Sequence, residues 1–130
     1  RMDIASYIDE EADIHHIFPA SYCEKQGFPR NKWNSVINKT PIYASSNRSI
    51  GGHAPSIYIG TMANKGLNQA KIQEAIVSHK INYSHLASDN FDAYFIDRAQ
   101  QLLNLIEKAM GKSVSGRDSE DTIREFGVKL

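Results

Sequence analysis

Two adjacent histidines, His15 and His16, stand in the stretch "EADIHHIFPAS", between an aspartate and a proline. An imidazole with its ordinary pKa of about 6.5 can accept a proton or bind a divalent metal ion at neutral pH. The stretch otherwise has the pattern of a short β-strand, in which successive side chains point to opposite faces. Both histidines can therefore serve one site only where the strand ends or twists, and Pro19 is a suitable stop.

Two short strands and a long connection must position this pair. The histidine strand is predicted over residues 13–18, and a second strand over 41–45. The connection between them has polar turns and at least one helical turn around 32–37, for which Trp33 and Val36 are the expected anchors.

Helices are predicted for most of the remaining chain. A short helix is expected in 45–52, where the two glycines end it, and another follows Asn68 as its N-cap. A long helix is expected from Phe91 to Gly111. Its apolar stripe favours a scaffold over a cofactor site, and it consists of Phe91, Phe95, Leu102, Leu103, Ile106 and Met110.

Composition sets the outer limits. The 130 residues are 41% hydrophobic and 23% charged with no net charge, which is typical of one soluble domain. The single Cys23 excludes an internal disulfide and a multi-cysteine zinc site, and it favours a cytoplasmic location. Residues 24–53 carry five basic side chains against one acidic side chain, a local excess that could attract phosphate. Because the chain begins at Arg1, we expect a piece of a longer protein.

The predicted elements follow in the order strand, strand, helix. Three segments of this region carry a motif: "DIHHIFP" (13–19), Asn38 in "INKTP" and "SSNRSIGGHAPS" (45–56). Together they resemble the HNH nucleases of the ββα-metal superfamily. The spacing of nine from Asn38 to Asn47 is similar to that in the HNH domain of RNA-guided CRISPR nucleases. The likeness is closer to the C-terminal HNH domain of GmrSD-like modification-dependent restriction enzymes, and it covers roughly residues 11–60.

The resemblance implies three residues in catalysis. His16 matches the general base that takes a proton from the attacking water. Asn38 matches the middle asparagine of the signature, which pins the loop by hydrogen bonds, and Arg48 is placed to hold a backbone phosphate.

The resemblance also implies one divalent metal ion. His15 and Asn47 match its ligands, and Asp13 adds a carboxylate either directly or through a hydrogen bond to His15. Mg²⁺ is favoured, with Mn²⁺, Ni²⁺ or Zn²⁺ as alternatives, because two neutral ligands hold Mg²⁺ weakly and imidazole suits the other metals.

The expected fold is therefore α+β, a ββα-metal (HNH) core at about 11–60 with a mostly helical C-terminal extension. We expect one domain over 1–130, with a helical scaffold at about 61–112 and a polar, loosely held tail at 113–130. The domain is expected to be the C-terminal part of a longer protein.

The expected function is metal-dependent hydrolysis of DNA, by nicking or double-strand cleavage, as the effector of an anti-phage restriction system. DNA and an N-terminal nucleotide-hydrolysing sensor domain are the expected partners, and no membrane is involved. Two alternatives stay open: a catalytically silent DNA-binding module on the same fold, and an RNA-directed nuclease.

Overall fold

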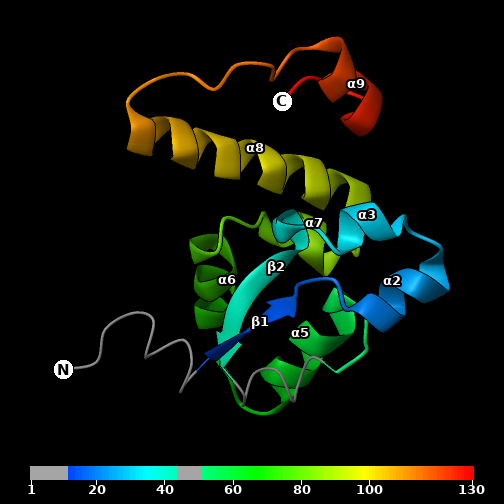
Figure 1. Ribbon diagram of the computed structural model, residues 1–130. Coiled ribbons are helices and arrows are strands. Elements are labelled where there is room, and N and C mark those ends of the chain that lie inside the picture. The colour runs from blue at the N-terminus through cyan, green and yellow to red at the C-terminus, as the bar shows by residue number, and fades with distance from the viewer. Residues whose placement is uncertain (1–11, 44–50) are drawn as a thin grey trace.

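The computed structural model describes residues 12–43 and 51–130, and there the protein is mostly helical with one small antiparallel sheet (Figure 1). This is an α+β architecture, as predicted. The described elements follow one another in the order β1 (Ala12–His16), α2 (Ala20–Gln26), α3 (Arg30–Trp33), the 3₁₀ helix η1 (Val36–Asn38), β2 (Lys39–Tyr43), α5 (Pro55–Asn64), α6 (Gln69–Ser78), α7 (Tyr83–Ala87), α8 (Phe91–Met110) and α9 (Glu120–Phe126).

The sheet consists of β1 and β2, paired so that His15 lies opposite Thr40 and His16 opposite Lys39. The predicted strands occur in the predicted places, with bounds shifted by one or two residues. β1 ends at His16, three residues before Pro19. It ends there because the next two residues turn into the core, where Ile17 is 3% and Phe18 0% exposed.

Helix α2 was not predicted, because its sequence "ASYCEKQ" has too few apolar residues to show a helical stripe. Its ends nevertheless follow ordinary rules. Pro19 precedes the first turn, and Gly27 follows the last turn with a left-handed φ of 76° that glycine adopts at little cost. The side chain of Cys23 anchors this helix in the core.

The helices of the second half begin and end where their caps predict. The Asn68 side chain accepts hydrogen bonds from the backbone N–H groups of Ala70 and Lys71 at the start of α6. Asn90 caps α8 in the same way, and Gly111 ends that helix with a φ of 70°. The short helix α7, which Asn82 caps, was not predicted.

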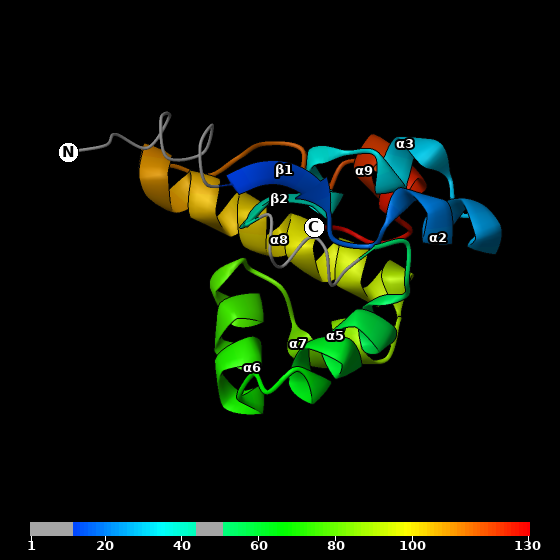
Figure 2. The ribbon, with the colours of Figure 1, turned by 90° about the horizontal axis from the view of Figure 1, so that it is seen from below.

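Helix α8 organises the rest of the molecule (Figures 1 and 2). In both views it runs past the sheet, with α5 and α6 on one side and α9 on the other. Its first half packs against α7 and η1. Within the described ranges, no helix has both the length and the apolar character needed to cross a membrane.

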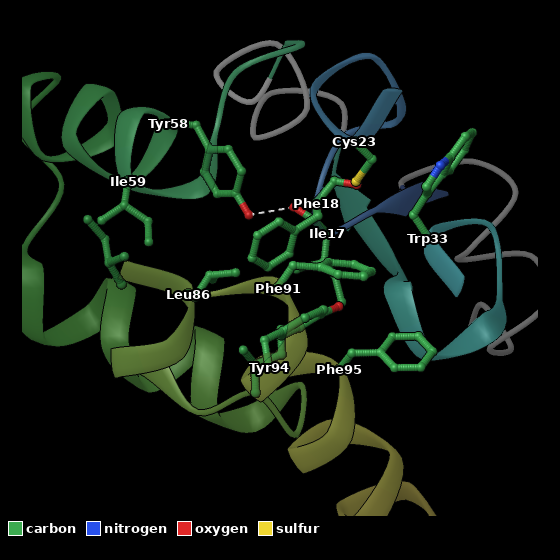
Figure 3. Packing of buried hydrophobic residues seen from close by; sticks show 12 residues of the cluster. Ile17, Phe18, Cys23, Trp33, Tyr58, Ile59, Leu86, Phe91, Tyr94 and Phe95 are labelled. Atoms are coloured by element: carbon green, nitrogen blue, oxygen red, sulfur yellow. Dashed lines mark hydrogen bonds between the residues drawn. The ribbon is translucent and has the colours of Figure 1, made fainter. Parts of the chain in front are cut away.

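The core centres on Phe18, which follows the histidine strand directly (Figure 3). Its ring lies 4.7 Å from that of Tyr94 and 5.2 Å from that of Phe91, measured between centroids. Trp33 is buried, as predicted. The prediction of Val36 as a second anchor was wrong: its side chain is 74% exposed, because η1 turns it away from the core.

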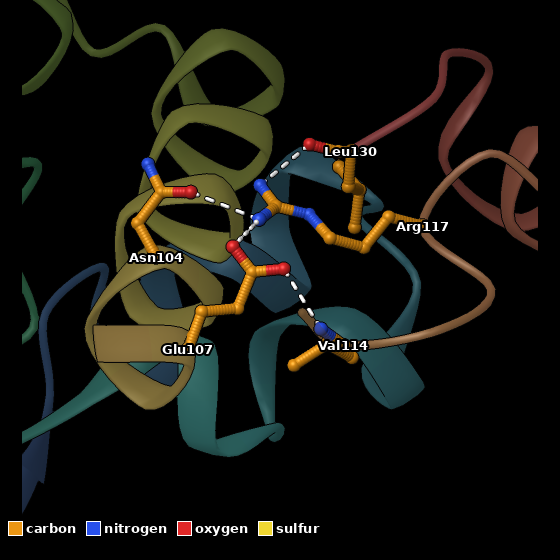
Figure 4. Close-up of polar contacts among 5 residues, drawn as sticks. All are labelled: Asn104, Glu107, Val114, Arg117 and Leu130. Carbon is orange, nitrogen blue, oxygen red and sulfur yellow. Dashed lines mark hydrogen bonds and ion pairs between the residues drawn. The ribbon is translucent and has the colours of Figure 1, made fainter. Parts of the chain in front are cut away.

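The C-terminal tail is bonded to α8 through one arginine, which gives it more fixed contacts than we expected (Figure 4). Arg117 forms an ion pair of 2.8 Å with Glu107 and donates hydrogen bonds to the Asn104 side chain and the Leu130 carbonyl oxygen. The backbone N–H of Val114 donates to the other carboxylate oxygen of Glu107, and these contacts lower the pKa of Glu107. The tail is therefore folded back along α8.

Candidate active site

The histidine pair lies at the end of β1, where the chain leaves the sheet. Both side chains are partly exposed, so both can meet a solute. They have different surroundings, because His15 faces the buried Thr40 across the sheet while His16 lies against Trp33 and Asn34. The strand ends at His16, two residues earlier than predicted, and the described contacts do not join the two rings.

Asn38 is fully buried and ties together both ends of the connection between the strands. Its Oδ1 accepts hydrogen bonds from the Phe18 backbone N–H and the Tyr94 hydroxyl, each at 2.9 Å. Its Nδ2 donates to the carbonyl oxygens of Phe18, at 3.0 Å, and Trp33, at 2.8 Å. An amide side chain can accept two hydrogen bonds and donate two, so Asn38 uses its full capacity. This is the loop-pinning pattern expected for it; its part in catalysis stays a prediction.

Further hydrogen bonds hold the backbone of Ile17, the residue after the histidine pair. The Ile17 N–H donates to the Asn38 carbonyl oxygen at 2.8 Å, one step beyond the last strand pair. The Tyr58 hydroxyl, buried on α5, donates to the Ile17 carbonyl oxygen at 2.7 Å (Figure 3). The residues that directly follow the histidines are thus held on several sides.

Helix α8 supplies two side chains that sequence reasoning missed. The Tyr94 hydroxyl reaches Asn38, and Arg98, only 5% exposed, donates from Nη1 to the carbonyl oxygens of Val36, Ile37 and Lys39. A signal for both was present in the sequence. Tyr94 and Arg98 stand three and seven residues after Phe91, on the helical stripe that enters the core, where polar groups must find partners. The exposed end of the predicted stripe, by contrast, includes Ile106 at 47% and Met110 at 48%.

Among the described residues, Asn34 and Trp33 contact the His16 side chain, and both come from the connection between the strands. Its Nε2 lies 3.0 Å from Asn34 Oδ1, and its ring meets Trp33 edge-on at 5.5 Å between centroids. The guanidinium of Arg30 lies over the indole ring of Trp33, 5.2 Å from its centroid. This places a cation on the same short helix as the residues that touch His16.

A further histidine, His79, is the C-terminal capping residue of α6 and contacts β2. Its Nδ1 is 2.7 Å from the Thr40 hydroxyl oxygen, and its carbonyl oxygen accepts from Arg98 Nε. Burial, and then the charge of Arg98, lower the pKa of His79. No role was predicted for His79, and its contacts identify it as a supporting residue of β2.

The side chains of three predicted site residues are not among those that the structure describes. Asn47 and Arg48 lie outside the described residues, and for Asp13 only the backbone position in β1 is described. His53, which follows the two glycines, is exposed. Cys23 is fully buried, and burial raises its pKa to about 12, so it is a packed thiol and no nucleophile.

The metal site stays a prediction. Among the described side chains, no group of three histidine, cysteine, aspartate or glutamate residues could hold a metal ion. His15 is the single predicted ligand whose side chain is described, and its partly exposed imidazole is a suitable donor for a divalent ion. The other two predicted ligands, Asn47 and Asp13, are those whose side chains are not described.

Comparisons with known proteins leave the family open. No family model matches the chain, and no solved structure is significantly similar to it. An uncharacterized protein of the archaeon Methanocaldococcus jannaschii is 37% identical over 76 residues, which cover 52% of this chain and 13% of that protein. The matched region is thus a small part of the relative, whose name describes no activity.

Proposed function

We propose that this chain is a metal-dependent HNH endonuclease domain that hydrolyses phosphodiester bonds of DNA. One observation carries the proposal: a buried asparagine, with all four hydrogen bonds of its amide made, fastens the residues that follow a strand-end histidine pair. A fully bonded, buried amide of this kind is expected where neighbouring side chains must be held in a fixed position. The sequence likeness to the ββα-metal nucleases then suggests the chemistry.

In the proposed reaction, His16 takes a proton from a water molecule. The water oxygen attacks the phosphorus atom, and the bond from phosphorus to the 3′ oxygen breaks. The products are a 5′-phosphate and, once the departing oxygen is protonated, a 3′-hydroxyl. Arg48 is proposed to hold a backbone phosphate.

A divalent ion, with Mg²⁺ favoured, is proposed to be held by His15 and Asn47, with Asp13 as a direct ligand or as a hydrogen-bond partner of His15. When bound, it stabilises negative charge on the phosphate and on the departing oxygen. In this scheme the two histidines have separate tasks, because His15 holds the ion and His16 removes the proton.

The wider setting is part of the same proposal. In the GmrSD-like restriction enzymes, a nuclease domain of this kind follows a nucleotide-hydrolysing sensor of foreign DNA. We propose that this chain likewise cuts as the effector of a longer anti-phage protein. Because the sensor controls the cut, we expect low activity from the isolated chain.

A defined substrate tests the chemistry. The chain is incubated with an end-labelled DNA duplex and Mg²⁺, Mn²⁺ or Ni²⁺, and the product ends are analysed. We expect 5′-phosphate and 3′-hydroxyl ends, no product in EDTA, loss of cleavage with unchanged DNA binding in His16→Ala, and weaker cleavage in Asn47→Ala.

Asn31→Ala is the matched control, because Asn31 is an exposed asparagine of α3 whose side chain bonds to Glu125. It should cut like the parent chain. Cleavage of labelled RNA but not DNA would support the RNA-directed alternative. Equal cleavage by His16→Ala and the parent would remove His16 from the mechanism.

A further inference from the structure

The contact between His16 and Asn34 is the one polar contact that the described residues make with the proposed base. Asn34 Oδ1 lies 3.0 Å from His16 Nε2, a normal hydrogen-bond distance. An amide oxygen can only accept a hydrogen bond, so Nε2 must carry the proton. The neutral ring then has its free electron pair on Nδ1.

Asn34 is well placed to fix this ring, because its own backbone is fixed. It is the C-terminal capping residue of α3, and its N–H donates to the Arg30 and Lys32 carbonyl oxygens. The carbonyl oxygen of its neighbour Trp33 accepts from the buried Asn38 amide. The loop that presents Asn34 is therefore anchored to the core at the preceding residue.

Trp33 also restrains the His16 imidazole, because its indole lies against the ring. Its indole is 4% exposed and meets the imidazole edge-on at an interplanar angle of 65°. A hydrogen bond on one ring nitrogen and an aromatic wall beside the ring together define both the tilt and the rotation of an imidazole.

We propose that Asn34 is the positioning residue of His16: it holds the imidazole in the Nε2–H tautomer and directs Nδ1 toward the attacking water. This inference rests on the proposed nuclease function for its purpose, but the contact itself can be measured without cleavage. Neither the sequence likeness nor the spacing of the motif assigns a role to Asn34.

The direct test is a long-range ¹H–¹⁵N spectrum of the full chain with labelled histidine, taken at a pH where the ring is neutral. We expect His16 of the parent chain to show the Nε2–H tautomer alone. In Asn34→Ala both tautomers should be populated, and Asn34→Asp, which keeps an acceptor oxygen, should restore the single one. The control Asn31→Ala should match the parent chain.

Cleavage kinetics give the second readout. Asn34→Ala is expected to lower kcat roughly tenfold with little change in KM, less than the 10²–10⁴-fold that a general base supplies, because the base itself remains. Asn34→Asp should recover most of the loss. Because Asn34 is exposed, the variants should unfold at the same denaturant concentration as the parent.

The outcomes separate the two proposals. A His16 spectrum that is unchanged by Asn34→Ala, or an Nδ1–H tautomer in the parent chain, overturns the positioning role. A spectrum that changes as expected, with no cleavage of nucleic acid in the presence of any metal even by the full-length protein supplied with nucleotide, overturns the nuclease and leaves the contact established. A kcat in Asn34→Ala equal to that of the parent overturns the catalytic purpose of the contact.

Discussion

His16 ends β1, and Asn38 directly precedes its strand partner Lys39, but the two side chains are held in different ways. Asn38 is fully buried with four hydrogen bonds, whereas His16 is partly exposed and its partner Asn34 is exposed. A buried network stabilises the fold, and an exposed contact orients a side chain at little cost in stability. Substitutions at the two positions should therefore have different effects.

Asn38→Ala should be strongly destabilising. It leaves the Phe18 N–H and the Trp33 carbonyl oxygen without their partner in the core, and it removes one of two partners from the Phe18 carbonyl oxygen and from the Tyr94 hydroxyl. We expect the free energy of unfolding in urea to fall by about 3 kcal/mol, because each orphaned buried group costs about 1–3 kcal/mol. Asn31→Ala should change it by less than about 0.5 kcal/mol. A similar small change for both would contradict the role of Asn38 as the main polar anchor.

His79 should make stability depend on pH. Its pKa is lowered by burial and by Arg98, so the unfolded chain binds this proton more readily than the folded chain. The contribution of neutral His79 is fully present above the ordinary pKa of about 6.5 and is lost as the pH falls toward the lowered value.

Thermal unfolding of the parent chain and of His79→Gln checks this. The parent Tm should drop more steeply than the variant Tm as the pH falls below about 6.5, because only the parent must exclude that proton from a buried ring. Parallel curves over the whole range would show that His79 is not held neutral.

At the scale of elements, η1 connects the candidate site to the long helix. Tyr94 and Arg98 lie one turn apart on α8 and both bond to η1 or the residue after it. Because a two-stranded sheet is marginally stable alone, β1 and β2 depend on such packing for their position. The helical half of the chain is therefore needed to hold the histidine strand.

Arg98→Met tests this dependence. The change keeps an apolar stem but leaves the carbonyl oxygens of η1 and His79 without their buried donor. We expect a loss of at least about 2 kcal/mol in urea unfolding. Lys108→Met, at an exposed position of the same helix, should be nearly neutral. If both variants unfold alike, α8 does not hold the sheet through this residue.

Local signals were enough to predict most elements. The caps Asn68, Asn90 and Gly111 act through backbone groups a few residues away, so the sequence states their effect directly. Helix α2 was not predicted because it has no apolar stripe; it is held by the tertiary contacts of the buried Cys23. Val36 was misplaced because a 3₁₀ turn has a different period from the α-helix that we assumed.

The candidate site was predictable only in part. The histidine pair and Asn38 form a motif in the sequence, and the structure describes all three. Asn34, Tyr94 and Arg98 were missed because each acts on a residue far along the chain, and only the tertiary fold sets such distances. The roles carried by resemblance stay predictions, among them those of Asn47 and Arg48, which lie outside the described residues.

At the scale of the whole molecule, contacts far apart in sequence converge on α3. Asn31 of α3 bonds to Glu125 of α9, and Phe126 of α9 stacks on Phe95 of α8 at 5.8 Å between ring centroids. The residues that touch His16 are held chiefly by the buried Asn38 amide, which accepts from Tyr94 of α8 and donates to the Trp33 carbonyl oxygen. This arrangement suits a rigid cutting unit, which we propose to work under the control of a larger protein.

Relaxation of supercoiled plasmid tests the central claim most directly, because one broken phosphodiester bond converts the whole molecule to the open circle. The parent chain, His16→Ala and Asn31→Ala are compared with Mg²⁺, Mn²⁺, Ni²⁺ or EDTA. We predict metal-dependent nicking by the parent and Asn31→Ala, and none by His16→Ala. Nicking that survives in His16→Ala, or no nicking with any metal even by the full-length protein supplied with nucleotide, would contradict the proposal.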